Sequence, residues 1–142
     1  MITPAEGSLH SGVIAISAAL TQVELGDSGD MENFLLAMAV VYEITCRLGG
    51  ELGFEAYSRG FQNTSTVGIF GAISTIAILK CLPSEIIEMT FGLAGSKAAG
   101  SMQYLDNGSW NKRLYAGFAV HNALVRVALA VAGRHSRGNQ SD

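Results

Sequence analysis

The sequence predicts an all-α fold in which about five helices pack as one domain. Apolar residues recur at three- and four-residue spacing in the long segments, and no stretch shows the alternation that is typical of a half-buried strand. The 142 residues allow one domain with one core. Hydrophobic residues make up 49% of the chain and charged residues only 15%, against roughly 25% charged in an average soluble domain. Some apolar helix faces are therefore expected to be buried against other protein.

The first half of the chain is expected to form two helices. The first covers Val13–Leu25, where apolar residues follow the helical spacing. The second covers Met31–Leu48 and is apolar on nearly every face, which is typical of a buried helix. Asp30 is its expected N-cap. A Gly-Gly pair at 49–50 is expected to end it, with 51–58 as a short continuation.

The second half is expected to form three more helices and a tail. The hydroxyl residues at 64–66 each suit the N-cap of an apolar helix over Val67–Leu82. A Pro-Ser-Glu start predicts the next helix over residues 83–101. The last is expected over Ala116–Ala132. Residues 134–142 are polar and lack apolar periodicity, so a disordered tail is expected there.

The sequence argues against a membrane-spanning protein, a secreted protein and a nucleic-acid-binding protein. The longest uncharged apolar run, Val67–Leu79, is shorter than the ~20 residues of a membrane-spanning helix. The candidate Leu114–Ala132 contains His121, Asn122 and Arg126. The first residues lack the positive charge and apolar core of a signal peptide, and a net charge of −3 indicates no basic surface for nucleic acid. We therefore expect an intracellular protein, cytoplasmic or mitochondrial, with no membrane or nucleic-acid partner.

The cysteines and one glycine-rich segment are expected to be structural. Cys46 and Cys81 lie in apolar segments without CxxC spacing, so both are expected to be reduced and buried, and not metal ligands. The segment GLAGSKAAG lacks the order and the preceding strand of a Walker phosphate loop. Its small residues Gly92, Gly95 and Ala99 instead predict close approach of another helix.

Polar residues gather at three places, each at or just before the start of an apolar helix. These places are His10 with Ser8, Arg59–Thr66, and Asp106–Arg113 with His121. Helix N-termini favour carboxylates and phosphates, and Lys112 and Arg113 would add charge-assisted hydrogen bonds. The pattern predicts a site for a small polycarboxylate. The alternative is that Thr64–Thr66 only cap a helix and that His10 and His121 are structural histidines.

The predicted site residues belong to a set of short sequence blocks that are spread along the chain. The blocks are Ser8-Leu9-His10-Ser11-Gly12, Tyr42-Glu43 with Arg47, Arg59-Gly60-Phe61, Thr64-Ser65-Thr66-Val67-Gly68, Phe70-Gly71, Leu93-Ala94-Gly95-Ser96, Gly108-Ser109-Trp110-Asn111-Lys112-Arg113-Leu114 and His121-Asn122. Together these blocks resemble the MmgE/PrpD family, which includes 2-methylcitrate dehydratases and cis-aconitate decarboxylases. The resemblance implies a helical domain followed by a smaller α/β lid domain, usually in a homodimer. It also implies lyase chemistry on small di- and tricarboxylates, without a cofactor or a metal.

The resemblance assigns roles to individual residues of this chain. His10 would be a general acid or base, and Lys112 would bind a substrate carboxylate. We expect the substrate carboxylates to be held by Arg113, Thr64 and Thr66 as well as by Lys112.

The chain also departs from the family at expected site positions. Gln62 stands where a histidine is expected, and an amide cannot exchange a proton near neutral pH. Tyr115 replaces a second histidine, and a phenol is a poor base because its proton is lost only at high pH. Residues 1–133 correspond only to a central part of the helical domain, without the lid or the acidic pair that normally precedes the His10 block.

These features leave three readings of the function. The first is a truncated lyase of this family, weak or inactive alone. The second is a non-catalytic pseudoenzyme or fragment that associates with a full-length relative. The third is that an error in gene prediction produced the short chain.

Overall fold

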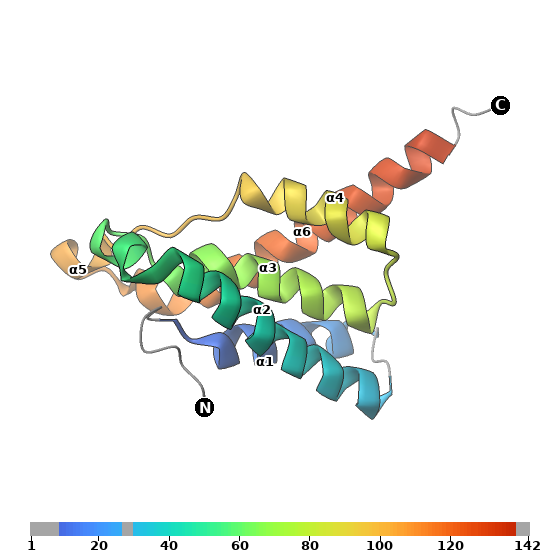
Figure 1. Ribbon diagram of the computed structural model, residues 1–142, viewed down its shortest axis with the longest axis horizontal. Coiled ribbons are helices and arrows are strands. Elements are labelled where there is room, and N and C mark those ends of the chain that lie inside the picture. Colours follow the sequence, from blue (N-terminus) through green and yellow to red (C-terminus); the bar gives the residue numbers. More distant parts are fainter. Residues whose placement is uncertain (1–8, 27–29, 139–142) are drawn as a thin grey trace.

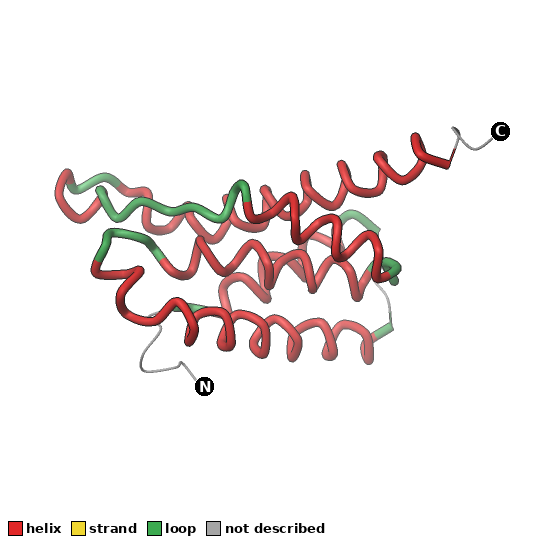
Figure 2. The backbone as a smooth tube through the Cα atoms, turned by 45° about the horizontal axis from the view of Figure 1, so that its top comes forward, coloured by secondary structure: helices red, strands yellow, loops and turns green. Residues whose placement is uncertain are grey.

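The fold is an all-α array, as the sequence predicts. The computed structural model describes residues 9–26 and 30–138, with side chains up to Gly133. Within these ranges there is no strand, only an isolated antiparallel bridge between Phe61 and Ser101. Helices make up most of the chain, and the longest loop follows α4 (Figure 2). The elements are α1 (Ser11–Glu24), α2 (Met31–Ser58), α3 (Asn63–Leu79), α4 (Ser84–Gly95), α5 (Tyr104–Asn107), the 3₁₀ turn η1 (Trp110–Arg113) and α6 (Leu114–Gly138).

Helix α3 lies at the centre of the array. It packs against α1, α2, α4 and α6 (Figure 1). Around it α1 contacts α2 and α6, and α4 contacts α6, whereas the described parts of α2 and α4 do not touch. The outer helices therefore form a ring around α3 that is open between α2 and α4.

The sequence of α3 explains its central place. It carries no charged residue and is buried along nearly its whole length. Two glycines let neighbouring helices come close: a Cβ on Gly68 would lie 2.7 Å from Cδ1 of Ile14 in α1, and one on Gly71 would lie 2.6 Å from Cγ2 of Thr45 in α2. A side chain at either position would push α1 or α2 away from the core.

Helix α2 does not end at the Gly-Gly pair, so that prediction is wrong. Gly49 is buried inside the helix, where an added Cβ would lie 1.9 Å from Cδ2 of Leu9. The regular helix breaks instead at Gly53, which has a φ of +60°. Asn63 donates a hydrogen bond of 3.1 Å to the carbonyl of Gly53.

The expected N-cap of α2 is confirmed, because a carboxylate oxygen of Asp30 accepts from the N–H of Asn33 at 2.8 Å.

The start of α3 also differs from the prediction. The helix begins at Asn63, and its N-cap is Gln62, whose Oε1 accepts a hydrogen bond of 2.7 Å from the N–H of Ser65. Thr64 and Thr66 therefore lie in the first turn and are not the cap.

Helix α4 ends at Gly95, six residues before its expected end at Ser101. The chain then runs antiparallel to the loop before α3: the N–H of Gln62 donates to the carbonyl of Gly100 at 3.0 Å, and the N–H of Met102 to the carbonyl of Gly60 at 2.9 Å. The close helix approach expected at Gly92 and Gly95 is wrong, since nothing lies within 4 Å of a Cβ placed on either.

The last helix and one cysteine also differ from expectation. The backbone of α6 is helical to Gly138, so it extends into the predicted tail, while 139–142 lie outside the described residues. Cys81 is exposed, which corrects its predicted burial; Cys46 is partly buried, and neither forms a disulfide. Within the described chain, Trp110–Gly133 is long and apolar enough to cross a membrane, a test that core helices also pass.

Candidate functional site

One end of the bundle collects the segments that carry the predicted site residues. Helices α1, α3 and α6 all begin there, next to α5 and the end of α2 (Figure 1). His10 immediately precedes α1, and its N–H donates a hydrogen bond of 2.9 Å to Oγ1 of Thr64, 54 residues away. The structure thus brings these two predicted site residues together. The imidazole of His10 is exposed, whereas Thr64 is buried; Ser8 lies outside the described residues.

A second set of contacts links this end to the glycine-rich loop after α4. Gln62 is hydrogen-bonded to Gly100 through the backbone, and a Cβ on Gly100 would lie 2.9 Å from Cβ of Ser65. The hydroxyl of Tyr115 donates to the carbonyl of Ser101. Both positions that replace an expected histidine are therefore tied to this loop. The amide of Gln62 acts as a helix cap and the phenol of Tyr115 as a loop anchor.

Lys112 and Arg113 lie in η1, immediately before α6, and both side chains are exposed. Among the described residues neither side chain forms a hydrogen bond or an ion pair with His10 or Thr64. Three pockets of about 760, 460 and 380 Å³ in the described chain are lined by none of His10, Lys112 and Arg113. The structure therefore leaves Lys112 and Arg113 facing solvent, where a carboxylate could reach them.

The sequence predicts that Thr66 and Lys112 bind the same substrate, but the pocket that Thr66 lines does not include Lys112. The hydroxyl of Thr66 donates to the carbonyl of Gln62 at 3.3 Å, and Thr66 lines a pocket of about 380 Å³ between the end of α2, the start of α3 and the loop after α4. Arg59 lines the same pocket and also a neighbouring one of about 460 Å³. Sequence reasoning did not select Arg59 as a site residue, although it begins one of the family-like blocks.

The remaining polar residues of this end are on the surface or in aromatic contacts. His121 is exposed on α6. Burial raises the pKa of Tyr104 above its ordinary value, with smaller effects from Tyr57 and Tyr115. The rings of Tyr104 and Tyr115 lie 5.8 Å apart. No group of three or more metal-ligating side chains occurs in the part of the chain that the structure describes.

These observations define an all-helical domain whose helix N-termini and polar loops meet at one end. A sequence model of the MmgE/PrpD N-terminal domain matches residues 4–141. The chain therefore belongs to the MmgE/PrpD family, as its sequence blocks predict. A comparison with curated proteins found no significant match.

Proposed function

We propose that this chain takes part in lyase chemistry without a cofactor, by dehydrating or decarboxylating small di- or tricarboxylates such as 2-methylcitrate or cis-aconitate. The hydrogen bond between the N–H of His10 and the hydroxyl of Thr64 carries this proposal. It joins two of the family-like blocks beside the start of α3, where the helix dipole favours an anion. Membership of the MmgE/PrpD family supports the same class of chemistry.

The described geometry suggests a different role for each proposed residue. The exposed imidazole of His10 exchanges a proton with the substrate, because an imidazole can both accept and donate a proton. Lys112 and Arg113 bind carboxylates through charge-assisted hydrogen bonds. Thr64 accepts from the backbone of His10 and so positions it. Thr66 contributes a hydroxyl at the neighbouring pocket.

The activity of the chain alone is proposed to be weak. Gln62 cannot exchange a proton near neutral pH, and its Oε1 already accepts a hydrogen bond from Ser65. Tyr115 is a poor base, and its hydroxyl already donates to Ser101. Only His10 is left among the expected general acids and bases of this region.

The test is turnover of 2-methylcitrate or cis-aconitate by the purified protein. We expect His10→Ala to lower kcat about 10²- to 10⁴-fold, because it removes the proton-exchanging group. Lys112→Met should mainly raise KM, and Lys97→Met, which changes another exposed lysine outside the site, should change neither constant. Turnover that survives His10→Ala unchanged would refute the catalytic role of His10. Absence of turnover in the wild type at every concentration would refute the lyase proposal.

The alternative is a non-catalytic protein that associates with a full-length relative or with a second copy. The outer faces of α1 and α6 favour it, because large apolar side chains are exposed there. They are Val13, Ile16, Leu20 and Val23 on α1, and Leu114, Phe118, Val125 and Leu129 on α6. Co-elution of the chain with a purified full-length family member in gel filtration would support this function. A well-folded monomer that binds neither the relative nor itself would contradict it.

A further inference from the structure

Helix α2 carries two Glu–Arg ion pairs of the same kind. Glu43 pairs with Arg47, and Glu55 pairs with Arg59, each four residues apart. The exposed fractions of the side chains are similar, 60% and 79% for the first pair and 73% and 70% for the second. Such exposed pairs contribute little to stability. The second pair lies at a pocket that both Glu55 and Arg59 line.

That pocket lies between the end of α2, the start of α3 and the loop after α4. Its volume of about 380 Å³ falls within the range of small-molecule sites. The walls are mainly apolar, and the ion pair supplies the charged groups. The lining residues are Leu52, Glu55, Ala56, Arg59, Phe61, Thr66 and Ala98.

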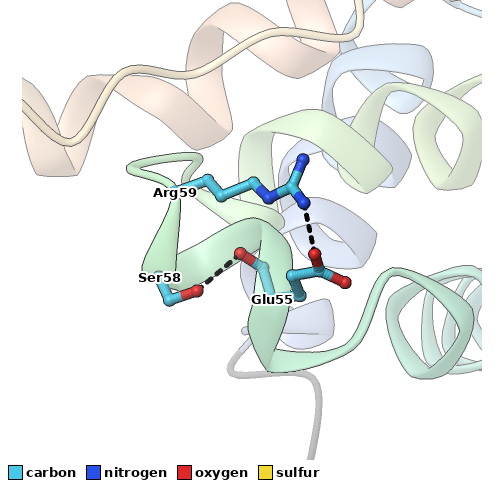
Figure 3. A network of polar contacts seen from close by, with 3 residues as sticks. All are labelled: Glu55, Ser58 and Arg59. Carbon is cyan, nitrogen blue, oxygen red and sulfur yellow. Dashed lines mark hydrogen bonds and ion pairs between the residues drawn. The ribbon is translucent and has the colours of Figure 1, made fainter.

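The backbone of α2 explains why Arg59 lies beside the pocket. The helix breaks at Gly53, so its last turns follow a new direction. Arg59 is the C-cap, where a cation is favoured by the helix dipole. Figure 3 shows its guanidinium group directed to the carboxylate of Glu55, while Ser58 donates to the carbonyl of Glu55 at 2.8 Å. Helix electrostatics thus account for the ion pair, but they do not account for the apolar pocket beside it.

We propose that Arg59 binds the carboxylate of a small ligand whose short apolar body occupies this pocket. The carboxylate of Glu55 already occupies the position that a ligand carboxylate would take, so the ligand would displace it from Arg59. A guanidinium group suits this exchange because its planar donors match a carboxylate. Thr66 offers a second polar group inside the pocket. The inference deepens the proposed function and rests on it for the ligand class.

The two ion pairs provide matched variants for the test. The probes are methylsuccinate and cis-aconitate, titrated into the full chain labelled with ¹⁵N and followed by amide chemical shifts. We expect shifts at Gly60, Phe61 and Ala98, because these residues lie at the pocket or beside it. Arg59→Gln should weaken binding about ten- to a hundredfold, the loss of a charge-assisted hydrogen bond. Glu55→Gln should strengthen binding several-fold, because it removes the competing carboxylate.

Arg47→Gln and Glu43→Gln are the controls, and both should leave the affinity unchanged. Equal binding by wild type and Arg59→Gln would overturn the inference, as would the absence of shifts at the pocket in the wild type. Weaker binding by Glu55→Gln would overturn the displacement of Glu55. Turnover assays separate this result from the lyase proposal. If the ligand binds at the pocket and binding requires Arg59, but no turnover is measured, only the lyase activity is refuted. If turnover is measured and Arg59→Gln does not change it, only the inference is refuted.

Discussion

At the scale of single residues, the buried amide of Gln22 is the clearest local cost in the fold. Its side chain is 0% exposed, and among the described residues neither Nε2 nor Oε1 has a hydrogen-bond partner. A buried polar group without a partner destabilises the folded state by about 1–3 kcal/mol. We expect Gln22→Leu to raise the free energy of unfolding by about that amount, because it removes both polar atoms at similar volume.

Urea unfolding would measure this change. The control is Gln22→Asn, which keeps an amide and loses a methylene group, so it should be less stable than the wild type. A Leu variant less stable than the wild type would show that the amide has a partner, such as a buried water molecule.

Gln62 and Tyr115, which stand where histidines are expected, show what can and cannot be predicted for a single residue. The sequence shows that Gln62 and Tyr115 cannot replace histidine as bases. It does not show what they do instead. The structure assigns Gln62 to capping α3 and Tyr115 to anchoring the loop at Ser101. The cap joins residues only three apart in the chain, whereas the contact of Tyr115 with Ser101 joins residues fourteen apart and depends on how the loop after α4 is placed.

At the scale of the element, the glycines of α3 determine how closely the helices pack. We expect Gly71→Ala to lower the free energy of unfolding by about 1–3 kcal/mol, because the new Cβ would meet Thr45 and Val41 of α2. The matched control is Gly92→Ala in α4, where nothing lies within 4 Å of an added Cβ. It should stabilise the fold by about 0.5–1 kcal/mol through helix propensity. Thermal and urea unfolding would test the opposite signs, and a neutral Gly71→Ala would contradict close packing there.

Element positions were predicted better than element ends. Periodicity located the helices that became α1, α2, α3, α4 and α6, but not the short α5 and η1. Glycine and hydroxyl residues were weaker guides to the ends. Gly49 is helical because it packs on Leu9, and Thr64 lies inside a helix that Gln62 caps. Ends depend on tertiary contacts as much as on local propensity.

At the scale of the whole molecule, polar and apolar surfaces are unevenly distributed. The described side chains of α1, α2 and α6 expose large apolar groups, whereas the exposed residues of α4 are serine, glutamate and glycine. An apolar surface of this extent is typical of an interface. We expect the double variant Leu20→Lys with Phe118→Lys to reduce association with a partner or second copy and to leave the fold intact, since both side chains are about half exposed.

Sedimentation velocity over a range of concentrations would measure that association. Lysines at Ser84 and Ala99, which are exposed elsewhere, add the same charge and should change the association little. Equal association of both double variants would assign the interface to another face.

The sequence by itself determined the all-α class, the approximate helix positions, the family and the residue types available for carboxylate chemistry. These follow from periodicity, composition and short blocks, which are local properties of the chain. Only the tertiary structure decided that His10 meets Thr64, that Gln62 pairs with Gly100 and that Arg59 lies at a pocket. The first two depend on how the ends of neighbouring helices pack around the start of α3, and the third on the direction of α2 after the break at Gly53. Packing joins residues that lie far apart in the chain, and spacing alone does not record such contacts.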